Sequence, residues 1–335
     1  MASLRDVAER AGVSVATASR VVSGSAAVRP ETRQKVERAM RELLYVAPDR
    51  PGTSRAIGLL LPEFGNPVFS ALAQALETCA ARAGRATILC NTHGSVDREV
   101  EYAYMLLERR VDGMIFISAE ITDTRGEHGH YTQLMESGAR LVFVNGASET
   151  LHVTSVGVDE RAAGRIATEH LIELGHRRIG FVAGQAFASP TREKQLGRDD
   201  ALRAAGLEPN GLVAHASFSV AGGRQAMRRL IELADGRPTA VICSSDLMAI
   251  GAMLEAASHG LRVPDDLSVV GFDGIDAATW TQPPLTTVEQ PIEVIAKTAI
   301  AALRAQIDDP EHAHPTYAFR PHLRRGGTTG PPAAD

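Results

Sequence analysis

The sequence predicts an α/β protein with a small helical head and a larger body built on parallel sheets. Helical spacing of apolar residues runs through about the first 45 residues. From Ala56 onward, short continuous apolar runs alternate with amphipathic stretches, which is typical of parallel strands covered by helices on both faces. These runs are too many for one small sheet. Gly157-Val158-Asp159, near the middle of the body, therefore indicates a crossing between two similar lobes.

The first two predicted helices lie within residues 4–23 and are joined by a tight turn at Gly12. Ser3 is placed to cap the first helix, with Asp6 at the capping-box position. Ser14 is placed to cap the second helix. The apolar faces comprise Leu4, Val7, Ala8 and Ala11 in the first helix and Ala18, Val21 and Val22 in the second. The pattern predicts a packed helical pair with a turn that favours glycine.

The outward face of the second helix is small and polar apart from one long cation. It carries Val15, Ala16, Thr17, Ser19 and Arg20. Such a helix fits a DNA major groove, where small side chains approach base edges and an arginine donates two hydrogen bonds to a guanine. A helical hairpin of another small domain has the same spacing, so the pattern alone leaves both interpretations open.

A third helix is predicted from Pro30 to about Tyr45, although Arg29 stands where a capping Ser or Asp is usual. Two prolines and a glycine then predict a linker. The expected domains are residues 1–45 for the head, 46–56 for the linker, 57–328 for the body and 329–335 for the tail. The Gly- and Pro-rich end, RRGGTTGPPAAD, is expected to be disordered.

The charge is distributed unevenly along the chain. Residues 1–56 carry ten Lys and Arg against six Asp and Glu, which gives +4, and the remainder carries 25 against 34, which gives −9. The sum is the net charge of −5. A basic head on an acidic body suits a module that contacts phosphate, although +4 is a modest excess.

The composition is that of an ordinary globular protein, with 44% hydrophobic and 22% charged residues. No apolar run reaches membrane-spanning length, and the N-terminus lacks the apolar core of a secretory signal. Cys79, Cys90 and Cys243 are far apart and lie in apolar surroundings. We therefore expect a cytoplasmic protein with reduced, buried cysteines and no membrane partner.

The sequence contains no HExxH, GxSxG, P-loop or GxGxxG motif. Two histidine pairs, His128 with His130 and His312 with His314, lack a third ligand nearby. We expect no catalytic residues, metal or cofactor. His176 is expected to be structural, and Glu99, Glu101, Glu108, Asp199 and Asp200 are expected to lie on solvated helix faces.

Head and body together resemble the lactose repressor / galactose repressor (LacI/GalR) family of bacterial transcription regulators. The motifs that carry this resemblance are DVAERAGVSVATASRVVSG, PETRQKVERAMRELLY, IGLLLPEFGNPVF, DGMIFIS, VGVDERAAG, ELGHRRIGFVAG, SSDLMAIGAM, VPDDLSVVGFDGID and PPLTTVEQP. Their order and spacing cover nearly the whole chain.

The resemblance implies a helix-turn-helix head that binds double-stranded DNA. Val15, Ala16 and Arg20 match residues that contact bases, and Ser14, Thr17 and Ser19 match residues that mostly contact phosphates. Two heads of a homodimer would bind an inverted-repeat operator, as expected for a repressor.

The resemblance also implies a body like periplasmic sugar-binding proteins, with two lobes and a cleft between them. The N-lobe would hold about 57–158 and 289–317, and the C-lobe about 159–288 and 318–328. Ligands bind outside the carboxyl ends of parallel strands, which places the effector in the cleft. The resemblance implies a sugar or sugar derivative, and polar side chains for hydroxyls with aromatic rings for apolar ring faces suit one. The candidate effector residues are Phe64, Asn66, Phe69, Ser118, Asn145, Arg192, Phe218, Ser245, Asp246 and Asp273.

Several of these residues also have structural interpretations. Asp246 starts a predicted helix and would serve as its N-cap. Asn145 precedes a glycine and would make a turn. Phe69 and Phe218 would belong to the core. Asp273 and Arg192 are the strongest candidates, because a charged group facing a cleft needs a partner.

One departure from the family concerns the linker. Family members usually carry a short hinge helix whose leucine enters the minor groove at the operator centre, whereas no leucine lies between Leu44 and Leu59 here. Pro48, Pro51 and Gly52 disfavour an ordered helix. We expect weak readout of the central step and little kinking of the DNA.

Two other functions remain as alternatives. The linker is also shorter than is usual in the family, which favours a small-molecule sensor whose DNA binding is weak or sequence-blind. Salt-dependent binding without sequence specificity would reveal such a sensor. An α/β enzyme with a helical appendix would require turnover of a bound sugar. The favoured mechanism is allosteric: effector closes the cleft, and head spacing changes. The helix from Pro67 and the helix from Pro291 to about Gln306 are expected to form the dimer face.

Overall fold

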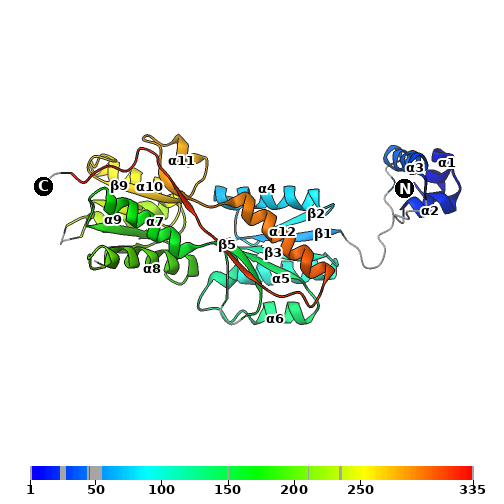
Figure 1. Cartoon of the computed structure of the whole chain (residues 1–335), viewed down its shortest axis with the longest axis horizontal. Coiled ribbons are helices and arrows are strands. Elements are labelled where there is room, and N and C mark those ends of the chain that lie inside the picture. Colours follow the sequence, from blue (N-terminus) through cyan, green and yellow to red (C-terminus); the bar gives the residue numbers. More distant parts are fainter. Residues whose placement is uncertain are drawn as a thin grey trace. The chain divides into compact units, whose positions relative to one another are not determined.

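The computed structural model describes residues 2–22, 28–43, 45, 55–148, 151–209, 211–233 and 236–333. The chain divides into two compact units, Met1–Ser54 and Arg55–Asp335, and both are drawn in Figure 1. Most of the linker, 46–54, lies outside the described residues, so the expected loss of the hinge helix is not addressed there. No described helix has the length and apolar character that crossing a bilayer requires.

The head consists of α1 (Leu4–Ala11), α2 (Val15–Val22) and α3 (Pro30–Glu42). Ser3 and Asp6 form the predicted capping box, and Gly12 ends α1 with φ of 66°. The small core is made by Val7, Ala8, Ala18, Val21, Val36 and Ala39. The helical periodicity of the sequence is therefore confirmed in the head.

The first sheet of the body has the order β11-β5-β4-β3-β1-β2. Its strands are β1 (Ala56–Leu61), β2 (Ala86–Asn91), β3 (Gly113–Ile117), β4 (Leu141–Val144), β5 (Thr154–Val158) and β11 (Thr316–Phe319), all paired in parallel. One face is covered by α4 (Pro67–Arg82) and α12 (Ile292–Asp308). The other is covered by α5 (Val96–Glu108) and α6 (Gly129–Glu136), and a 3-10 turn, η1 (Glu120–Thr122), follows β3.

The second sheet has the order β12-β10-β9-β8-β6-β7. Its strands are β6 (Ile179–Ala183), β7 (Val213–His215), β8 (Ala240–Cys243), β9 (Ser268–Asp273), β10 (Thr286–Glu289) and β12 (His322–Arg324), of which only β12 pairs antiparallel. Its helices are α7 (Glu160–Glu173), α8 (Ser189–Ala204), α9 (Val220–Ile231), α10 (Asp246–Ser258) and the short α11 (Ala277–Trp280). The predicted parallel α/β architecture is confirmed.

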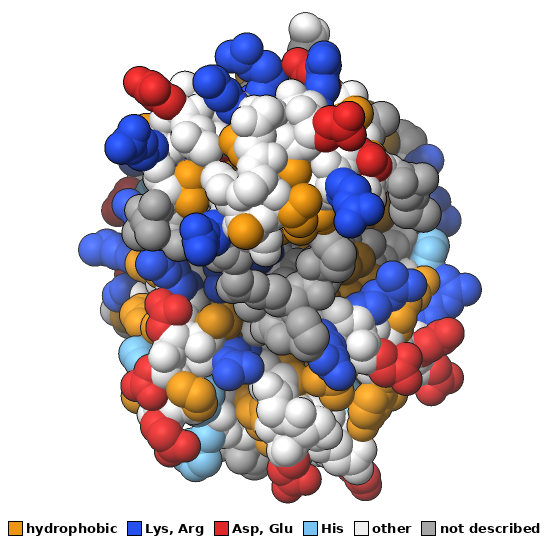
Figure 2. Space-filling view, turned by 90° about the vertical axis from the view of Figure 1, so that its right-hand side faces the viewer, with side chains coloured by type: hydrophobic (Ala, Val, Ile, Leu, Met, Phe, Trp, Pro, Cys, Tyr) orange, Lys and Arg blue, Asp and Glu red, His pale blue; other side chains and the backbone are white. Residues whose placement is uncertain are grey.

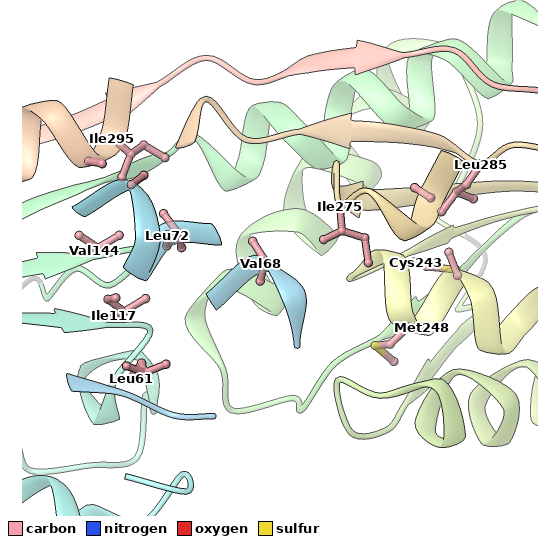
Figure 3. Close-up of a cluster of buried hydrophobic side chains, with 14 of the residues drawn as sticks. Leu61, Val68, Leu72, Ile117, Val144, Cys243, Met248, Ile275, Leu285 and Ile295 are labelled. Atoms are coloured by element: carbon pink, nitrogen blue, oxygen red, sulfur yellow. The ribbon is translucent and has the colours of Figure 1, made fainter. Parts of the chain in front are cut away.

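The chain passes from one sheet to the other after β5, after β10 and after β11. The first passage follows Gly157-Val158, where the sequence indicated it. One hydrophobic cluster spans both lobes: Val68 of α4 and Ile275 after β9 lie between the two groups of core side chains (Figure 3). The lobes are therefore in apolar contact beside the cleft.

Helices of the second lobe pack unusually closely in two pairs. A Cβ atom at Gly164 of α7 would lie 2.0 Å from the Lys194 carbonyl oxygen, and one at Gly197 of α8 would lie 1.9 Å from the Arg161 carbonyl oxygen. Gly223 of α9 and Gly251 of α10 make similar approaches. These contacts leave no space for side chains, so backbone packs on backbone.

The expected disordered tail is wrong for its first residues. Thr328 is buried, and its hydroxyl donates to the Val269 carbonyl oxygen. The Thr329 hydroxyl lies 3.0 Å from His170 Nε2, and the Gly330 backbone N–H donates to Ser268 Oγ. His176, which contacts the Gly330 carbonyl oxygen and Thr239, is structural as expected. Two threonine hydroxyls and the Gly330 backbone therefore bind this part of the chain to the second lobe.

Candidate functional site

The exposed side of α2 is the candidate DNA-binding face. Val15, Ala16, Ser19 and Arg20 are exposed, and Thr17 is half-buried. In the view of Figure 2, Lys and Arg side chains (blue) lie among uncharged and apolar ones. The face therefore combines small side chains, which permit close approach, with a long cation.

Ser14 fixes the start of this helix. Its Oγ accepts from the Thr17 backbone N–H at 3.1 Å, and the two hydroxyls are 2.9 Å apart. The predicted cap is therefore present, and both hydroxyls take part in it. The remaining amide groups of the first turn form a positive end that suits a phosphate.

The body contains a cleft of about 840 Å³ between its two lobes. Residues from both sheets line it at the carboxyl ends of β1 to β4 and of β6, β8 and β9. Seven of the ten predicted effector residues are among them: Asn66, Phe69, Ser118, Asn145, Phe218, Ser245 and Asp273. The strand-end rule thus located the cleft wall from sequence.

The floor of the cleft is a hydrogen-bonded row that joins the lobes. Asn145 Nδ2 donates to Gln290 Oε1 at 2.8 Å, and Gln290 Nε2 donates to Asp273 Oδ1 at 2.8 Å. Asn145 Oδ1 is buried without a hydrogen-bond partner in the described part of the chain. Asn145 and Asp273 have φ of 54° and 120°. The backbone is therefore strained at both ends of the row, as is common where residues contact ligands.

Two buried carboxyl groups are close together here: Asp273 belongs to the floor, and Asp246 lies behind it. Burial raises the pKa of Asp246 to about 7, although three hydrogen-bond donors oppose the shift. Burial and the neighbouring Asp246 charge raise the pKa of Asp273 well above its ordinary value. Two carboxylates this close in a desolvated site disfavour simultaneous ionisation.

Asp246 neither lines the cleft nor caps its helix, so both expectations for it are wrong. Ser245 is the N-cap, and its Oγ accepts from the Met248 backbone N–H. Asp246 Oδ2 accepts from the backbone N–H groups of Gly274 and Ile275, and its Oδ1 accepts from the Thr287 hydroxyl. Both oxygens of the Asp246 carboxyl group therefore accept hydrogen bonds within the protein, and those of Oδ2 hold the turn after Asp273.

Phe64 and Arg192 also lie outside the cleft lining. Phe64 is 49% exposed in the turn before α4. Arg192 is exposed on α8, whereas Lys194 faces the cleft. Positions two apart on a helix differ by about 200° in direction, which explains why only one of the pair points inward.

Lys194 is one of the residues that sequence reasoning missed. It is buried, forms an ion pair with Glu160 and lies 3.7 Å from the centre of the Phe272 ring. Its place on the inward face of α8 could have been found only with the helix start known. It brings a fixed cation and a paired carboxylate to one wall of the cleft.

Glu99 is the second missed residue, and its expected solvated position is wrong. Only 3% of Glu99 is exposed, and its carboxylate accepts from the Tyr131 hydroxyl and from the Glu120 backbone N–H. Burial and the Glu99 charge raise the pKa of Tyr131 far above its ordinary value. The strand-end rule offered one signal for Glu99. The segment that follows the carboxyl end of β2 contributes Thr92, His93 and Glu99 to the cleft lining.

The histidine pairs have ordinary roles. His128 Nε2 contacts the Glu120 carbonyl oxygen, and His130 lies 3.6 Å from Glu99. His314 contacts the Thr154 hydroxyl. Across the described residues, no group of three or more His, Cys, Asp or Glu side chains is arranged to hold a metal ion.

Comparison with known proteins places the head and the body in one family. Residues 3–48 match the description "Bacterial regulatory proteins, lacI family", and 168–329 match "Periplasmic binding protein-like domain". An HTH-type transcriptional regulator encoded in the aml 5′ region of Streptomyces limosus is 40% identical over 97% of this chain and 94% of its own. The chain belongs to the LacI family. It is therefore a DNA-binding transcription regulator.

Other regulators are also similar to this chain over almost its whole length. The regulator MalR of Streptomyces coelicolor is 37% identical over 98% of this chain and 97% of its own. A lac repressor dimer bound to operator and the anti-inducer ONPF superimposes with a TM-score of 0.83 at 28% identity, covering 98% and 99% of the two chains. A CelR–cellobiose complex gives 0.76 at 31% identity, covering 98% and 100%.

Proposed function

We propose that this LacI-family chain is a homodimeric repressor that binds an inverted-repeat operator and is controlled by a sugar in its cleft. The observation that carries the proposal is the row Asn145–Gln290–Asp273. It crosses between the lobes, and Asn145 Oδ1 on the cleft floor has no hydrogen-bond partner within the part of the chain that the structure describes. A polyol placed there would contact both lobes at once.

The DNA contacts follow from the exposed side of α2. Val15 and Ala16 offer methyl groups to thymine methyls, and Arg20 offers a guanidinium to a guanine. Ser14, Thr17 and Ser19 would contact phosphates and fix the register of the helix. The Ser14 and Thr17 hydroxyls keep acceptor and donor capacity beyond the helix cap.

The effector contacts come from polar and aromatic side chains in the cleft. Asn66, Ser118, Asn145, Ser245 and Asp273 would bind hydroxyls in fixed directions. Phe69 and Phe218 would cover the apolar faces of a sugar ring. The CelR–cellobiose complex supports this class of ligand, because its fold is the same.

The dimer face is proposed on α4 and α12, which pack against each other, and on the neighbouring part of the second lobe. Figure 1 draws α4 and α11 along one side of the body. Large exposed apolar side chains occur on these and adjacent elements: Leu89, Val294, Leu254 and Trp280. Trp280, at 76% exposed, is unusual for a monomer and suits burial against a second copy.

Effector would change the position of one lobe relative to the other, because the residues that would contact it lie on both lobes. In a dimer joined through the lobes, movement of the N-lobes changes the spacing of the heads and therefore operator affinity. We assign the chain to the cytoplasm, where an operator is accessible, and assign it no catalytic role.

Cleft variants test the proposal. Asp273→Asn and Asn145→Ala should bind operator normally and lose the response to a sugar that shifts the wild-type protein. Arg192→Ala is the matched control, because Arg192 is exposed and outside the cleft. Fluorescence anisotropy with labelled operator, with and without sugar, measures both the operator affinity and its response to the sugar. An unchanged response in both cleft variants would refute this effector site.

A further inference from the structure

The lining of the cleft carries more carboxylates than cations. Its acidic residues are Glu63, Glu99, Glu120, Asp123, Glu160 and Asp273. Among the described residues that line it, the fixed cations are Arg125 and Lys194. The cleft lining therefore holds more acidic than basic side chains before any ligand enters.

Both cations are already paired with carboxylates of the same lining. Arg125 Nη2 lies 2.6 Å from Asp123 Oδ2, and Lys194 pairs with Glu160. The Arg125 guanidinium also lies 3.6 Å from the centre of the Phe187 ring. A ligand anion would have to break one of these pairs to gain a cationic partner, which leaves a carboxylate without its partner.

The open positions on the floor are hydrogen-bond acceptors. Asn145 Oδ1 is buried without a partner among the described residues, and Asp273, which also lines the cleft, accepts through Oδ1 from Gln290. These two acceptors come from opposite lobes. They need a ligand that supplies donors at two points.

The wall opposite adds a third acceptor. Glu120 is half-buried in the turn after β3, and its carboxylate has no hydrogen-bond donor in the described part of the chain. Glu99, whose oxygens are occupied by Tyr131 and the Glu120 backbone N–H, places a further negative charge beside it. Burial and the charges of Asp123 and Glu99 raise the pKa of Glu120, which shows how poorly added negative charge is tolerated there.

From these contacts we infer that the cleft selects an uncharged or amine-bearing carbohydrate and excludes sugar phosphates and sugar acids. The inference rests on the proposed function, since it specifies the chemistry of the same effector site. Hydroxyl and ammonium groups donate hydrogen bonds to Asn145, Asp273 and Glu120. Phosphate and carboxylate groups offer only acceptors and bring like charge into a partly desolvated site.

Calorimetric titration of the full-length protein with a matched panel tests the inference. The panel contains glucose, glucosamine, glucuronate and glucose 6-phosphate, the corresponding galactose series, and cellobiose and maltose with cellobionate and maltobionate. We expect each acid and phosphate to bind at least tenfold more weakly than its neutral parent, and each amine at least as tightly. An anion that binds as tightly as its neutral parent would overturn the inference and leave the sugar-effector proposal intact. Binding by no member of the panel would overturn both.

Charge-removing variants separate electrostatic exclusion from shape. Glu120→Gln keeps an acceptor oxygen in the cleft lining and removes one acidic group. The ratio of anion to neutral-sugar dissociation constants should fall at least threefold in this variant. Glu208→Gln, an exposed carboxylate outside the cleft, should leave the ratio unchanged. An unchanged ratio in Glu120→Gln would contradict the inference.

Discussion

The backbone N–H of Thr124 donates to the carbonyl oxygen of Phe187 at 2.9 Å, across the mouth of the cleft. Thr124 follows η1 in the first lobe, and Phe187 lies between β6 and α8 in the second. The Thr124 hydroxyl donates to the same oxygen at 3.0 Å, and the next pair of residues, Asp123 and Ala188, forms an isolated β-bridge. The two lobes are thus fastened together on the side of the cleft away from its floor.

Loss of this interlobe contact should weaken effector binding. Thr124→Pro removes both donors, and each net hydrogen bond is worth about 0.5–1.5 kcal/mol. If the open form becomes dominant, the closed form that binds effector is less populated, and the apparent dissociation constant rises by roughly five- to 150-fold when both hydrogen bonds are lost. Thr124→Val, which keeps the backbone N–H, should have a smaller effect. Calorimetry with the tightest sugar of the panel measures both, and equal affinity for all three proteins would contradict the expected role.

Arg20 should carry most of the sequence preference of the head. Arg20→Ala removes the only long cation of the outward α2 face and should cost on the order of 1–3 kcal/mol per half-site. Arg38→Ala removes an equal charge from the exposed side of α3 and should weaken all duplexes alike. Anisotropy titrations on operator and scrambled DNA measure both variants. If both variants lost the same amount of preference for operator over scrambled DNA, Arg20 would not be the residue that reads the bases.

The α7–α8 contact should tolerate no added methyl group. In Gly197→Ala, the new Cβ atom would lie 1.9 Å from the Arg161 carbonyl oxygen. Overpacking typically costs about 1–3 kcal/mol, and separation of these helices would also displace Lys194 from the cleft. Gly129→Ala, with nothing within 4 Å of its Cβ, is the control. Urea unfolding should show a large loss of stability only for Gly197→Ala.

Stability should fall as pH rises toward neutrality because of Asp246. Its pKa is raised from 3.8 in the unfolded chain to about 7 in the folded protein. The stabilising contribution is therefore complete below about pH 4 and is lost as pH rises toward 7, because the unfolded chain releases its proton first. At about 1.4 kcal/mol per pKa unit, the contribution is on the order of 4 kcal/mol at most.

Asp246→Asn tests this dependence. An asparagine can accept from Gly274 and Ile275 through its oxygen and donate to the Thr287 hydroxyl, so the turn should persist. Melting temperatures between pH 5 and pH 8 should fall less in the variant than in the wild-type protein. An equal slope in both would show that Asp246 is not the titrating group.

Local rules predicted the features that depend on neighbours in sequence. The Ser3 cap, the positive φ of Gly12 and the parallel strands of the body follow from residue type and spacing alone. The strand-end rule found Asn145 and Asp273 because parallel strands place their carboxyl ends at one edge of a sheet. These inferences needed no tertiary information.

Features that depend on distant contacts escaped prediction. Glu99 is buried because Tyr131, 32 residues further along the chain, donates to it. Asp246 holds the turn after Asp273, which no local pattern reveals. Thr328 and Gly330 are ordered because β9 and Ser268 offer them partners. Arg192 is predicted to line the cleft, but the register of α8 turns its side chain outward and that of Lys194 toward the cleft. Sequence fixes the start of a helix only within a few residues.

Selection of binding sites from a random duplex pool by the full-length protein tests the central claim most directly. At physiological salt, an effector-responsive homodimeric repressor should enrich an inverted repeat, and a neutral sugar that binds the cleft should change that enrichment. The short linker predicts a variable centre between the half-sites, and a fixed central step would contradict that part of the account. Only salt-sensitive background, with no enriched repeat with or without sugar, would contradict the account as a whole.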